Sequence, residues 1–381
     1  MASGYTYLHV ILPPTCPRQT YRLSTRTFKP LRLPRTVVKY ADLPIIDLSK
    51  AATAEGRTEL AAIVRDTMKT SGFMYVINHG YSPAQMKRIF DIANVPFDAV
   101  KNDEKQIYAG DIKATGSYQG YKLRKYWHIA NGVHDQIENY NIHPDSDPKQ
   151  HPEALRPFLP EIEAFLEHCH VNILHSILRL LALGLEMPEE TLVNTHKYNA
   201  QTESWLRLMK YYPKSEEEEE KTENVWLKGH TDVGSVTILW SQPVAALQVR
   251  SPEGRWKWVR HIDNALVINI GDALEFLSGG LYKATIHRVV QPPPSQRGYT
   301  KLSVIYFAFL DNDVVLKPLE EIPVIMRQGP RPDRLPEQGK EPTMDEYRKA
   351  RIRAYGQSEV KKGGGGVDTE YLEGILVKHY N

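Results

Sequence analysis

The spacing of hydrophobic positions changes near residue 200, and this change separates a helical part of the chain from a strand-rich part. Before residue 200, apolar residues recur at helical spacing over residues 55–71, 83–104 and 158–185, which predicts amphipathic helices. Short apolar runs at residues 43–48 and 73–77 predict two strands beside the first helix. We expect the long helix at 158–185 to brace a sheet.

After residue 200 the chain consists of short runs rich in β-branched and aromatic residues, separated by Gly, Pro and Asp. The predicted strands span residues 205–212, 225–227, 235–240, 246–249, 256–259, 265–270, 284–290 and 302–309. Many short strands at this spacing indicate a sandwich or barrel. Two segments are predicted to be irregular: the polar residues 105–150, of a length typical of loops that line sites, and the solvated run Glu216–Glu220.

The pattern favours one large domain of the α+β class, an all-β core with helical decoration. We divide it into an extended amino-terminal arm (1–41), an α+β module (42–200), a strand-rich core (201–320) and a helical segment covering the site (321–381). The arm carries seven basic residues and no acidic one, as a mitochondrial presequence does. Its five prolines interrupt any amphipathic helix, so we prefer an extended surface arm.

Composition narrows the class of partner more than it narrows the fold. Forty-eight Lys and Arg residues face 46 Asp and Glu residues, a formal charge of +2, which is too balanced for a nucleic-acid groove or an anionic membrane. No apolar run reaches the roughly 18 residues of a membrane span, and two cysteines are too few for a disulfide framework. We therefore expect a cytoplasmic protein that acts on a small molecule, with its oligomeric state left open.

Candidate chemistry is concentrated in two of the predicted strands. His230 and Asp232 lie two residues apart, so on an extended segment both side chains point to the same side. With His287, further along the chain, they can form a metal site that leaves positions open on iron(II) for a co-substrate and dioxygen. The alternative is that each histidine is an ordinary core residue. For the histidines of the long helix, His168, His170 and His175, we prefer a structural or surface role.

The surroundings of these residues resemble a known family. The strings GHTDVGSVTILW and NIGDALEFLSGGLYKATIHRVV, preceded in order by LPIIDLS, GFMYVINHG and Gly120-Tyr121, are similar to those of the iron(II) and 2-oxoglutarate dioxygenases of the isopenicillin N synthase-like family. The resemblance covers roughly residues 40–320. It implies a double-stranded β-helix, or jelly roll, with His230, Asp232 and His287 as iron ligands at its open end.

The resemblance also implies a reaction and its co-substrates. Dioxygen cleaves 2-oxoglutarate to succinate and carbon dioxide, and a C–H bond of a small metabolite is hydroxylated, desaturated or closed into a ring. Such reactions need a metal, because side chains cannot supply this chemistry unaided. Ascorbate is a candidate stimulant, and natural-product biosynthesis is a candidate setting.

The expected co-substrate site departs from the family pattern at one position. Where the family has Arg-x-Ser on the strand after the second histidine, this chain has Lys301-Leu302-Ser303. Lysine keeps the charge but replaces a two-pronged donor by a point donor, and we expect Lys301 and Ser303 to hold the distal carboxylate of 2-oxoglutarate. Tyr212 matches the family's Tyr-Tyr-Pro strand and is a further candidate, with a core tyrosine as the alternative. The weaker candidates for ligand contact are Tyr121, Arg124, Arg207 and Arg297.

Three functions compete at this point. The first is a 2-oxoglutarate oxygenase. The second is an oxidase like isopenicillin N synthase, which uses the same triad without 2-oxoglutarate, and the lysine at position 301 keeps this hypothesis open. The third is a jelly-roll binding protein that has lost catalysis, which the complete triad disfavours.

Overall fold

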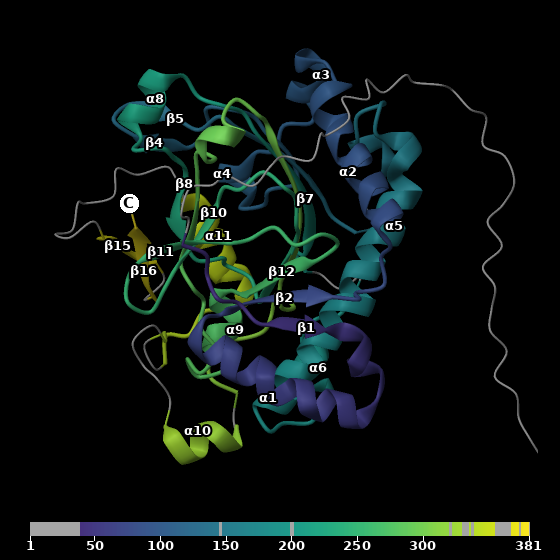
Figure 1. Ribbon diagram of the computed structural model, residues 1–381, viewed down its shortest axis with the longest axis vertical. Coiled ribbons are helices and arrows are strands. Elements are labelled where there is room, and N and C mark those ends of the chain that lie inside the picture. The colour runs from purple at the N-terminus through teal and green to yellow at the C-terminus, as the bar shows by residue number, and fades with distance from the viewer. Residues whose placement is uncertain are drawn as a thin grey trace, which may run out of the picture.

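The computed structural model describes residues 39–380 apart from 145–146, 199–201, 320–321, 330–334, 337–338, 355–366 and 373–374. The predicted arm at residues 1–41 therefore lies almost wholly outside the described residues. Two sheets lie at the centre of the molecule, with helices packed around them (Figure 1).

The larger sheet contains eight strands and much of the hydrophobic core. Its order is β1 (Ile45–Asp47), β2 (Phe73–Ile77), β12 (Leu266–Ile270), β9 (Val236–Trp240), β14 (Lys301–Ala308), β7 (Trp205–Tyr211), β6 (Ile137–Ile142) and β3 (Gly120–Lys122). Neighbouring strands are antiparallel except β1 and β2, which are parallel.

The smaller sheet contains six strands and completes the predicted jelly roll. Its order is β11 (Trp256–Trp258), β10 (Leu247–Arg250), β13 (His287–Val290), β8 (Val225–His230), β16 (Ile375–Tyr380) and β15 (Val367–Leu372). All eight strands predicted after residue 200 are present in the two sheets. A small separate hairpin is formed by β4 (His128–Ala130) and β5 (Val133–His134).

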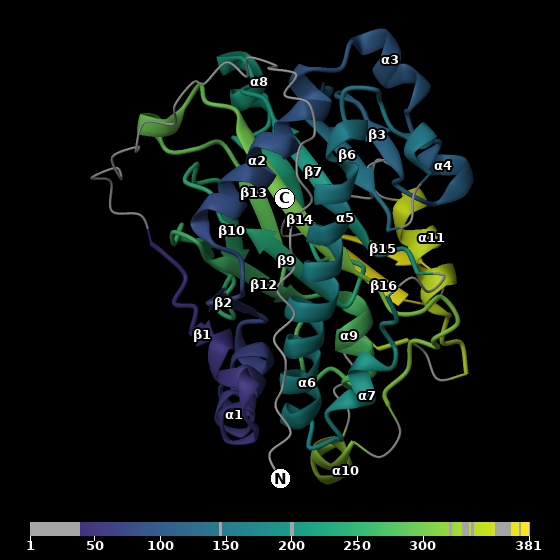
Figure 2. The same cartoon turned by 90° about the vertical axis from the view of Figure 1, so that its right-hand side faces the viewer.

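The predicted long helix is one continuous rod beside the larger sheet (Figure 2). It consists of α5 (Leu159–Glu167), the π-helical stretch η4 (His168–Leu174) and α6 (His175–Gly184). The stretch η4 packs on β9 and β14, while α2 (Pro83–Asp98) packs on β7 and β14 and α1 (Ala54–Thr70) packs on α6. These helices cover one face of the larger sheet and leave its other face to the smaller sheet.

The histidines of the rod have structural roles, with His170 buried and His168 and His175 half-buried. His170 bonds the Tyr306 hydroxyl through Nδ1 at 2.7 Å and the His196 carbonyl through Nε2 at 2.8 Å. His168 and His175 contact backbone carbonyl oxygens through Nε2 at 2.9 and 3.4 Å. Hydrogen bonds to the protein therefore account for all three rings.

The irregular structure predicted for residues 105–150 is wrong in part. This segment contains β3, β4, β5 and β6, and β6 is entirely buried despite its polar sequence. Two of its polar side chains are paired in the interior, Glu138 with Lys105 at 2.8 Å and Asn141 with Arg207 at 2.7 Å, which offsets part of the cost of burying them. The segment also contains α4 (Ile112–Thr115) and η2 (Pro148–Gln150).

The solvated loop predicted at Glu216–Glu220 is a short helix, α8 (Glu216–Lys221). Ser215 caps it in a capping box with Glu218, and carboxylates in a first turn are stabilised by the helix dipole. Glu219 is buried and accepts a hydrogen bond from Trp226 Nε1 at 2.7 Å. Local capping and one tertiary contact thus overcome the repulsion on which the prediction was based.

The carboxy-terminal segment, predicted to be helical, also contains strands. Helices α10 (Pro323–Gln328) and α11 (Met344–Ala354) are followed by the β15–β16 hairpin, which joins the smaller sheet through the pair Tyr380 and Gly229. The remaining elements are α3 (Asn102–Ile107), α7 (Glu190–Val193), α9 (Asp272–Leu277), η1 (Leu48–Ala52), η3 (Arg156–Phe158) and η5 (Pro294–Gln296).

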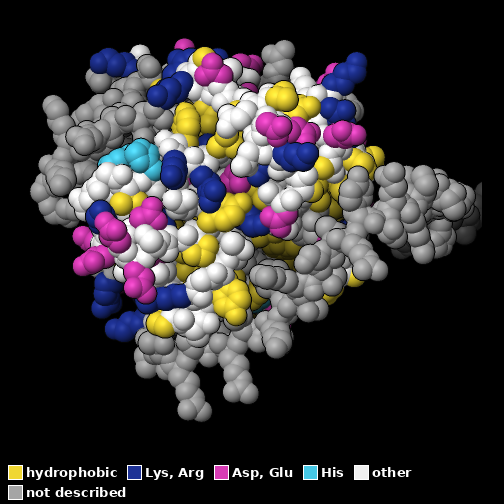
Figure 3. Space-filling view, turned by 90° about the horizontal axis from the view of Figure 1, so that it is seen from above, with side chains coloured by type: hydrophobic (Ala, Val, Ile, Leu, Met, Phe, Trp, Pro, Cys, Tyr) yellow, Lys and Arg dark blue, Asp and Glu magenta, His cyan; other side chains and the backbone are white. Residues whose placement is uncertain are grey.

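The described surface carries charges of both signs. Seen from above, Lys and Arg side chains are interspersed with Asp and Glu side chains, and hydrophobic side chains lie between them (Figure 3). This mixture agrees with the net charge of +2. Within the part of the chain that the structure describes, no helix has the length and apolar character needed to cross a membrane.

Candidate active site

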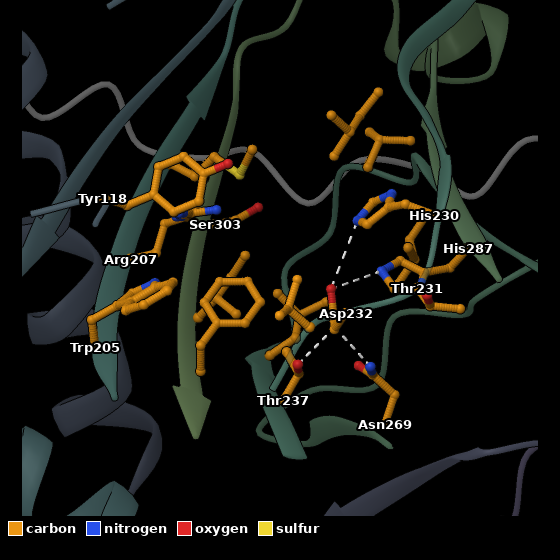
Figure 4. A pocket seen from close by; sticks show the side chains of 18 of the residues that line it. Tyr118, Trp205, Arg207, His230, Thr231, Asp232, Thr237, Asn269, His287 and Ser303 are labelled. Atoms are coloured by element: carbon orange, nitrogen blue, oxygen red, sulfur yellow. Dashed lines mark hydrogen bonds and ion pairs between the residues drawn. The ribbon is translucent and has the colours of Figure 1, made fainter. Parts of the chain in front are cut away.

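Three potential metal ligands converge where β8 and β13 meet. His230 ends β8, His287 begins β13, and the two residues are paired across the strands. The Nε2 atoms of His230 and His287 lie 3.7 and 3.6 Å from Oδ1 of Asp232 (Figure 4). The three ligand atoms all lie within 4.8 Å of one another. The structure therefore brings together the three residues that the sequence selected.

Backbone hydrogen bonds determine which nitrogen each histidine offers. His230 Nδ1 lies 2.8 Å from the carbonyl oxygen of Lys228, and His287 Nδ1 lies 3.1 Å from that of Thr285. A carbonyl oxygen only accepts, so Nδ1 carries the proton and Nε2 presents its lone pair to the site. Burial, followed by the nearby His287, lowers the pKa of His230 to about 4. This imidazole is therefore neutral at neutral pH, as a metal ligand must be.

Two side chains orient the carboxylate of Asp232. Thr237 Oγ1 and Asn269 Nδ2 donate hydrogen bonds to Oδ2 at 2.6 and 2.8 Å, which leaves Oδ1 facing the histidines. Burial alone would raise the pKa of Asp232, but His287, His230 and these two hydrogen bonds hold it below the ordinary value. Two neutral imidazoles and one carboxylate on a common face fit iron(II) with open coordination positions.

A pocket opens beside the triad, between the two sheets (Figure 4). Its walls come from β2, β7, β9, β12 and β14 of the larger sheet, from β8, β10 and β13 of the smaller sheet, and from α11. Arg351 and Ile352 are the contribution of α11, so the carboxy-terminal segment forms part of the pocket. Aromatic side chains form much of the wall: Phe73, Tyr118, Trp127, Trp205, Tyr211, Phe307 and Phe309.

Lys301 and Ser303 both point from β14 into this pocket. Lys301 Nζ donates to Ser303 Oγ at 2.5 Å and lies 4.9 Å from the centre of the Tyr211 ring. Burial lowers the pKa of Lys301 to about 7, and no acidic side chain in the described part of the chain offsets that effect. A buried ammonium of this kind is stabilised by an anion, which a ligand in the pocket can supply.

Tyr212 does not lie in the pocket. Its hydroxyl donates to Glu138 Oε2 at 3.0 Å, and its ring stacks with Arg124 at 4.7 Å on the other side of the sheet. Tyr211 lines the pocket in its place, because neighbouring residues on a strand point to opposite faces. The position of Tyr212 contradicts a role in holding the co-substrate.

Of the weaker candidates, only Arg207 reaches the pocket. Tyr121 donates its hydroxyl to the carbonyl oxygen of Pro96 at 2.8 Å, which is a structural role. Arg124 and Arg297 are exposed and do not line the pocket.

Several pocket residues were missed from the sequence. Trp205 and Phe307 could have been found by following the alternation of β7 and β14 from Lys301. Tyr118 and Trp127 lie in the segment predicted to be irregular, and Arg351 lies on α11 in the segment predicted to be helical. Their positions depend on tertiary contacts that no local pattern signals.

Comparison with known proteins shows the family. The model of the 2OG-Fe(II) oxygenase superfamily matches residues 202–309, and that of the non-haem dioxygenase in morphine synthesis N-terminal region matches residues 43–161. The UPF0676 protein C1494.01 of Schizosaccharomyces pombe is 31% identical over 290 residues, which cover 74% of this chain and 85% of that protein.

Two further relatives belong to the same group of enzymes by name, and one solved structure shares the fold. Homoarginine-6-hydroxylase 2-ODD-233 of Oryza sativa is 26% identical over 73% of this chain and 88% of that protein, and jasmonate-induced oxygenase 3 of Arabidopsis thaliana is 28% identical over 74% and 75%. A full-length Neurospora crassa protein, solved by crystallography in complex with alpha-KG, has a TM-score of 0.70, with 22% identity over 86% of this chain and 99% of that chain.

With its jelly roll, its triad and these matches, the chain belongs to the iron(II) and 2-oxoglutarate-dependent oxygenases. It is an oxidoreductase that uses iron(II), with 2-oxoglutarate and dioxygen as co-substrates.

Proposed function

We propose that this oxygenase holds iron(II) through His230, Asp232 and His287, holds 2-oxoglutarate through Lys301 and Ser303, and oxidises a C–H bond of a small organic molecule. The observation that carries the proposal is the buried Lys301 ammonium, directed into the pocket of the triad from the facing sheet. Iron(II), when bound, supplies the dioxygen chemistry that side chains lack.

The protein's own side chains orient 2-oxoglutarate and the substrate in the pocket. Lys301 Nζ and Ser303 Oγ bind the distal carboxylate, so the 2-oxo end of the co-substrate points across the pocket toward the triad. A charge-assisted hydrogen bond in a water-poor site is stronger than one at the surface. The aromatic walls exclude water and provide an apolar space for the substrate.

An anaerobic titration tests the co-substrate site. Addition of iron(II) and then 2-oxoglutarate should produce the visible charge-transfer band of the chelate. Lys301→Met should weaken 2-oxoglutarate binding at least tenfold, as expected for loss of a charged hydrogen bond, whereas Lys301→Arg should retain binding. Lys257→Met, on β11 outside the pocket, is the matched control. Unchanged affinity in Lys301→Met would contradict the proposal.

The same samples test the alternatives. Admission of air should release succinate, even without a substrate. Oxygen uptake without succinate would favour an oxidase of the isopenicillin N synthase type, and the absence of iron uptake would favour a binding protein. Loss of iron binding in His230→Ala and His287→Ala is expected if the triad is the metal site.

The names of the relatives support a small organic substrate. Jasmonate-induced oxygenase 3 and homoarginine-6-hydroxylase are plant enzymes named for metabolites or hormones, and natural-product metabolism is the setting we propose. The cytoplasmic location inferred from the sequence stays a prediction.

A further inference from the structure

We infer that the substrate of this oxygenase is a flat molecule bearing a carboxylate, stacked against the aromatic wall of the pocket and paired with Arg207. The inference rests on the proposed function, because it assigns the part of the same pocket that iron(II) and 2-oxoglutarate leave for the substrate. Neither the family nor the triad determines this chemistry, since the fold serves many substrates.

Arg207 lies on β7 beyond the strand positions that face Lys301 and Ser303. On β7 and β14, Tyr211 is paired with Lys301, and Arg207 is paired with Ile305. Ser303 is paired with Met209, so Arg207 lies four positions, about 13 Å, from the register of Lys301 and two positions, about 7 Å, from that of Ser303. A five-carbon diacid that is held at Lys301 and Ser303 and directed toward the triad runs across the strands and not along them, so we assign Arg207 to a different ligand.

The guanidinium of Arg207 is held among aromatic rings. Its Cζ lies 4.5 Å from the ring centre of Tyr118, 5.0 Å from that of Phe307 and 5.7 Å from that of Trp205. Its Nε donates to Asn141 Oδ1 at 2.7 Å, which fixes the plane of the group. Such a planar donor matches a carboxylate better than a point charge does.

The rings beside Arg207 favour a flat ligand. Trp205 lies 4.7 Å from Phe309 and 5.9 Å from Phe307, between ring centres, so one wall of the pocket is a continuous aromatic surface. Tyr118, Trp205 and Arg207 lie together on the side opposite the triad (Figure 4). A planar molecule between this wall and the triad gains stacking contacts while its edge faces the metal.

The charges of the pocket favour an anion. Its charged lining residues, apart from the histidines, are Arg207, Lys301, Arg351 and Asp232, and Asp232 is the single acidic one among the described lining residues. Asp232 belongs to the metal site, so a cationic side chain such as that of homoarginine has no other carboxylate in this lining to pair with. The substrate end of the pocket thus repels cations and attracts anions.

Binding of simple probes tests the inference. Enzyme loaded with Mn(II) and 2-oxoglutarate is titrated with benzoate, cinnamate and 2-naphthoate, each compared with its own primary amide, and with cyclohexanecarboxylate as a carboxylate that is not flat. Tryptophan fluorescence and calorimetry report binding. We expect at least one flat carboxylate to bind about tenfold or more tightly than its amide and than cyclohexanecarboxylate.

Variants connect this preference to Arg207. Arg207→Gln should weaken the preferred carboxylate about 10- to 100-fold and leave its amide unchanged, and Arg207→Lys should give an intermediate loss because the charge remains without the fork. Arg260→Gln is the control, since Arg260 is exposed and stacks on Tyr40 at 4.8 Å outside the pocket. It should bind all probes as the parent does.

Three outcomes would overturn the inference alone. Equal binding of amides and carboxylates, or no binding of any flat carboxylate by enzyme that has bound 2-oxoglutarate, would show that the substrate is of another class. Weaker 2-oxoglutarate binding in Arg207→Gln would assign Arg207 to the co-substrate. Failure of the parent enzyme to bind Mn(II) or 2-oxoglutarate, measured first on the same sample, would overturn the proposed function as well.

Discussion

Lys301 should make the affinity for 2-oxoglutarate depend on pH. Burial lowers its pKa to about 7, and only the ammonium form pairs with a carboxylate. Bound 2-oxoglutarate favours that form and raises the pKa again, so affinity is complete at low pH and falls by up to about tenfold per unit above pH 7. Anaerobic titrations at about pH 6 and about pH 8 measure the change. Lys301→Arg, charged throughout, should show no such fall, and a flat profile in the parent would refute this assignment.

The two hydrogen bonds to Asp232 should determine metal affinity. Without Thr237 Oγ1 and Asn269 Nδ2, Oδ2 of Asp232 loses both donors, and the carboxylate can turn away from the histidines. Thr237→Val and Asn269→Leu are each expected to weaken Co(II) or iron(II) binding by about 10- to 100-fold. Thr58→Val, at an exposed threonine of α1, is the control. If a variant that combines both substitutions bound the metal as tightly as the parent, these contacts would only support the fold.

Residue by residue, the sequence predicted the metal site better than the co-substrate site. His230 and Asp232 are two apart on one extended segment, so their common direction follows from strand geometry alone. The choice between Tyr211 and Tyr212 depended on which face of β7 meets the pocket, and a shift of one residue reverses every side chain of a strand. That register is set by the pairing of Tyr211 with Lys301, which a single sequence does not contain.

At the level of elements, those that bury one apolar face were predicted correctly. The long rod 159–184 and the strands after residue 200 carry their burial pattern in the sequence. Strand β6 was missed because Glu138, Asn139 and Asn141 make it look exposed, although Lys105 and Arg207 supply partners for two of them. The hairpin β15–β16 was missed because it joins the smaller sheet through a strand far away in the sequence.

Helix α11 is attached to the site through Arg351. Its Nη2 donates to the carbonyl oxygen of Thr231, between two metal ligands, and lies 3.4 Å from Oδ2 of the fully buried Asp272. Arg351→Met removes this cation from a buried carboxylate, and we expect the free energy of unfolding to fall by about 3 kcal/mol. Urea denaturation measures the change. Arg353→Met, at an exposed arginine of the same helix, should change it by less than about 0.5 kcal/mol; equal effects would mean that α11 is stabilised by other contacts.

At the scale of the whole molecule, the residues that bind the metal and those proposed to bind 2-oxoglutarate come from different sheets. The metal ligands belong to β8, β13 and the turn that follows β8, all on the side of the smaller sheet, whereas Lys301 and Ser303 belong to β14 of the larger sheet. The metal alone therefore stabilises one side of the jelly roll. A co-substrate that reaches from the metal to Lys301 connects both sides.

This connection predicts two separable increments in stability. A ligand that binds only the folded state adds about 2.7 kcal/mol at a concentration 100 times its Kd, so Mn(II) should raise the thermal unfolding temperature and 2-oxoglutarate should raise it further. Lys301→Met should keep the first increment and lose most of the second at the same concentrations, because its metal ligands are intact. His287→Ala should lose both, since 2-oxoglutarate then has no metal to chelate. If 2-oxoglutarate stabilised Lys301→Met as much as the parent, its distal carboxylate would have to bind elsewhere, and the larger sheet would not take part in co-substrate binding through this lysine.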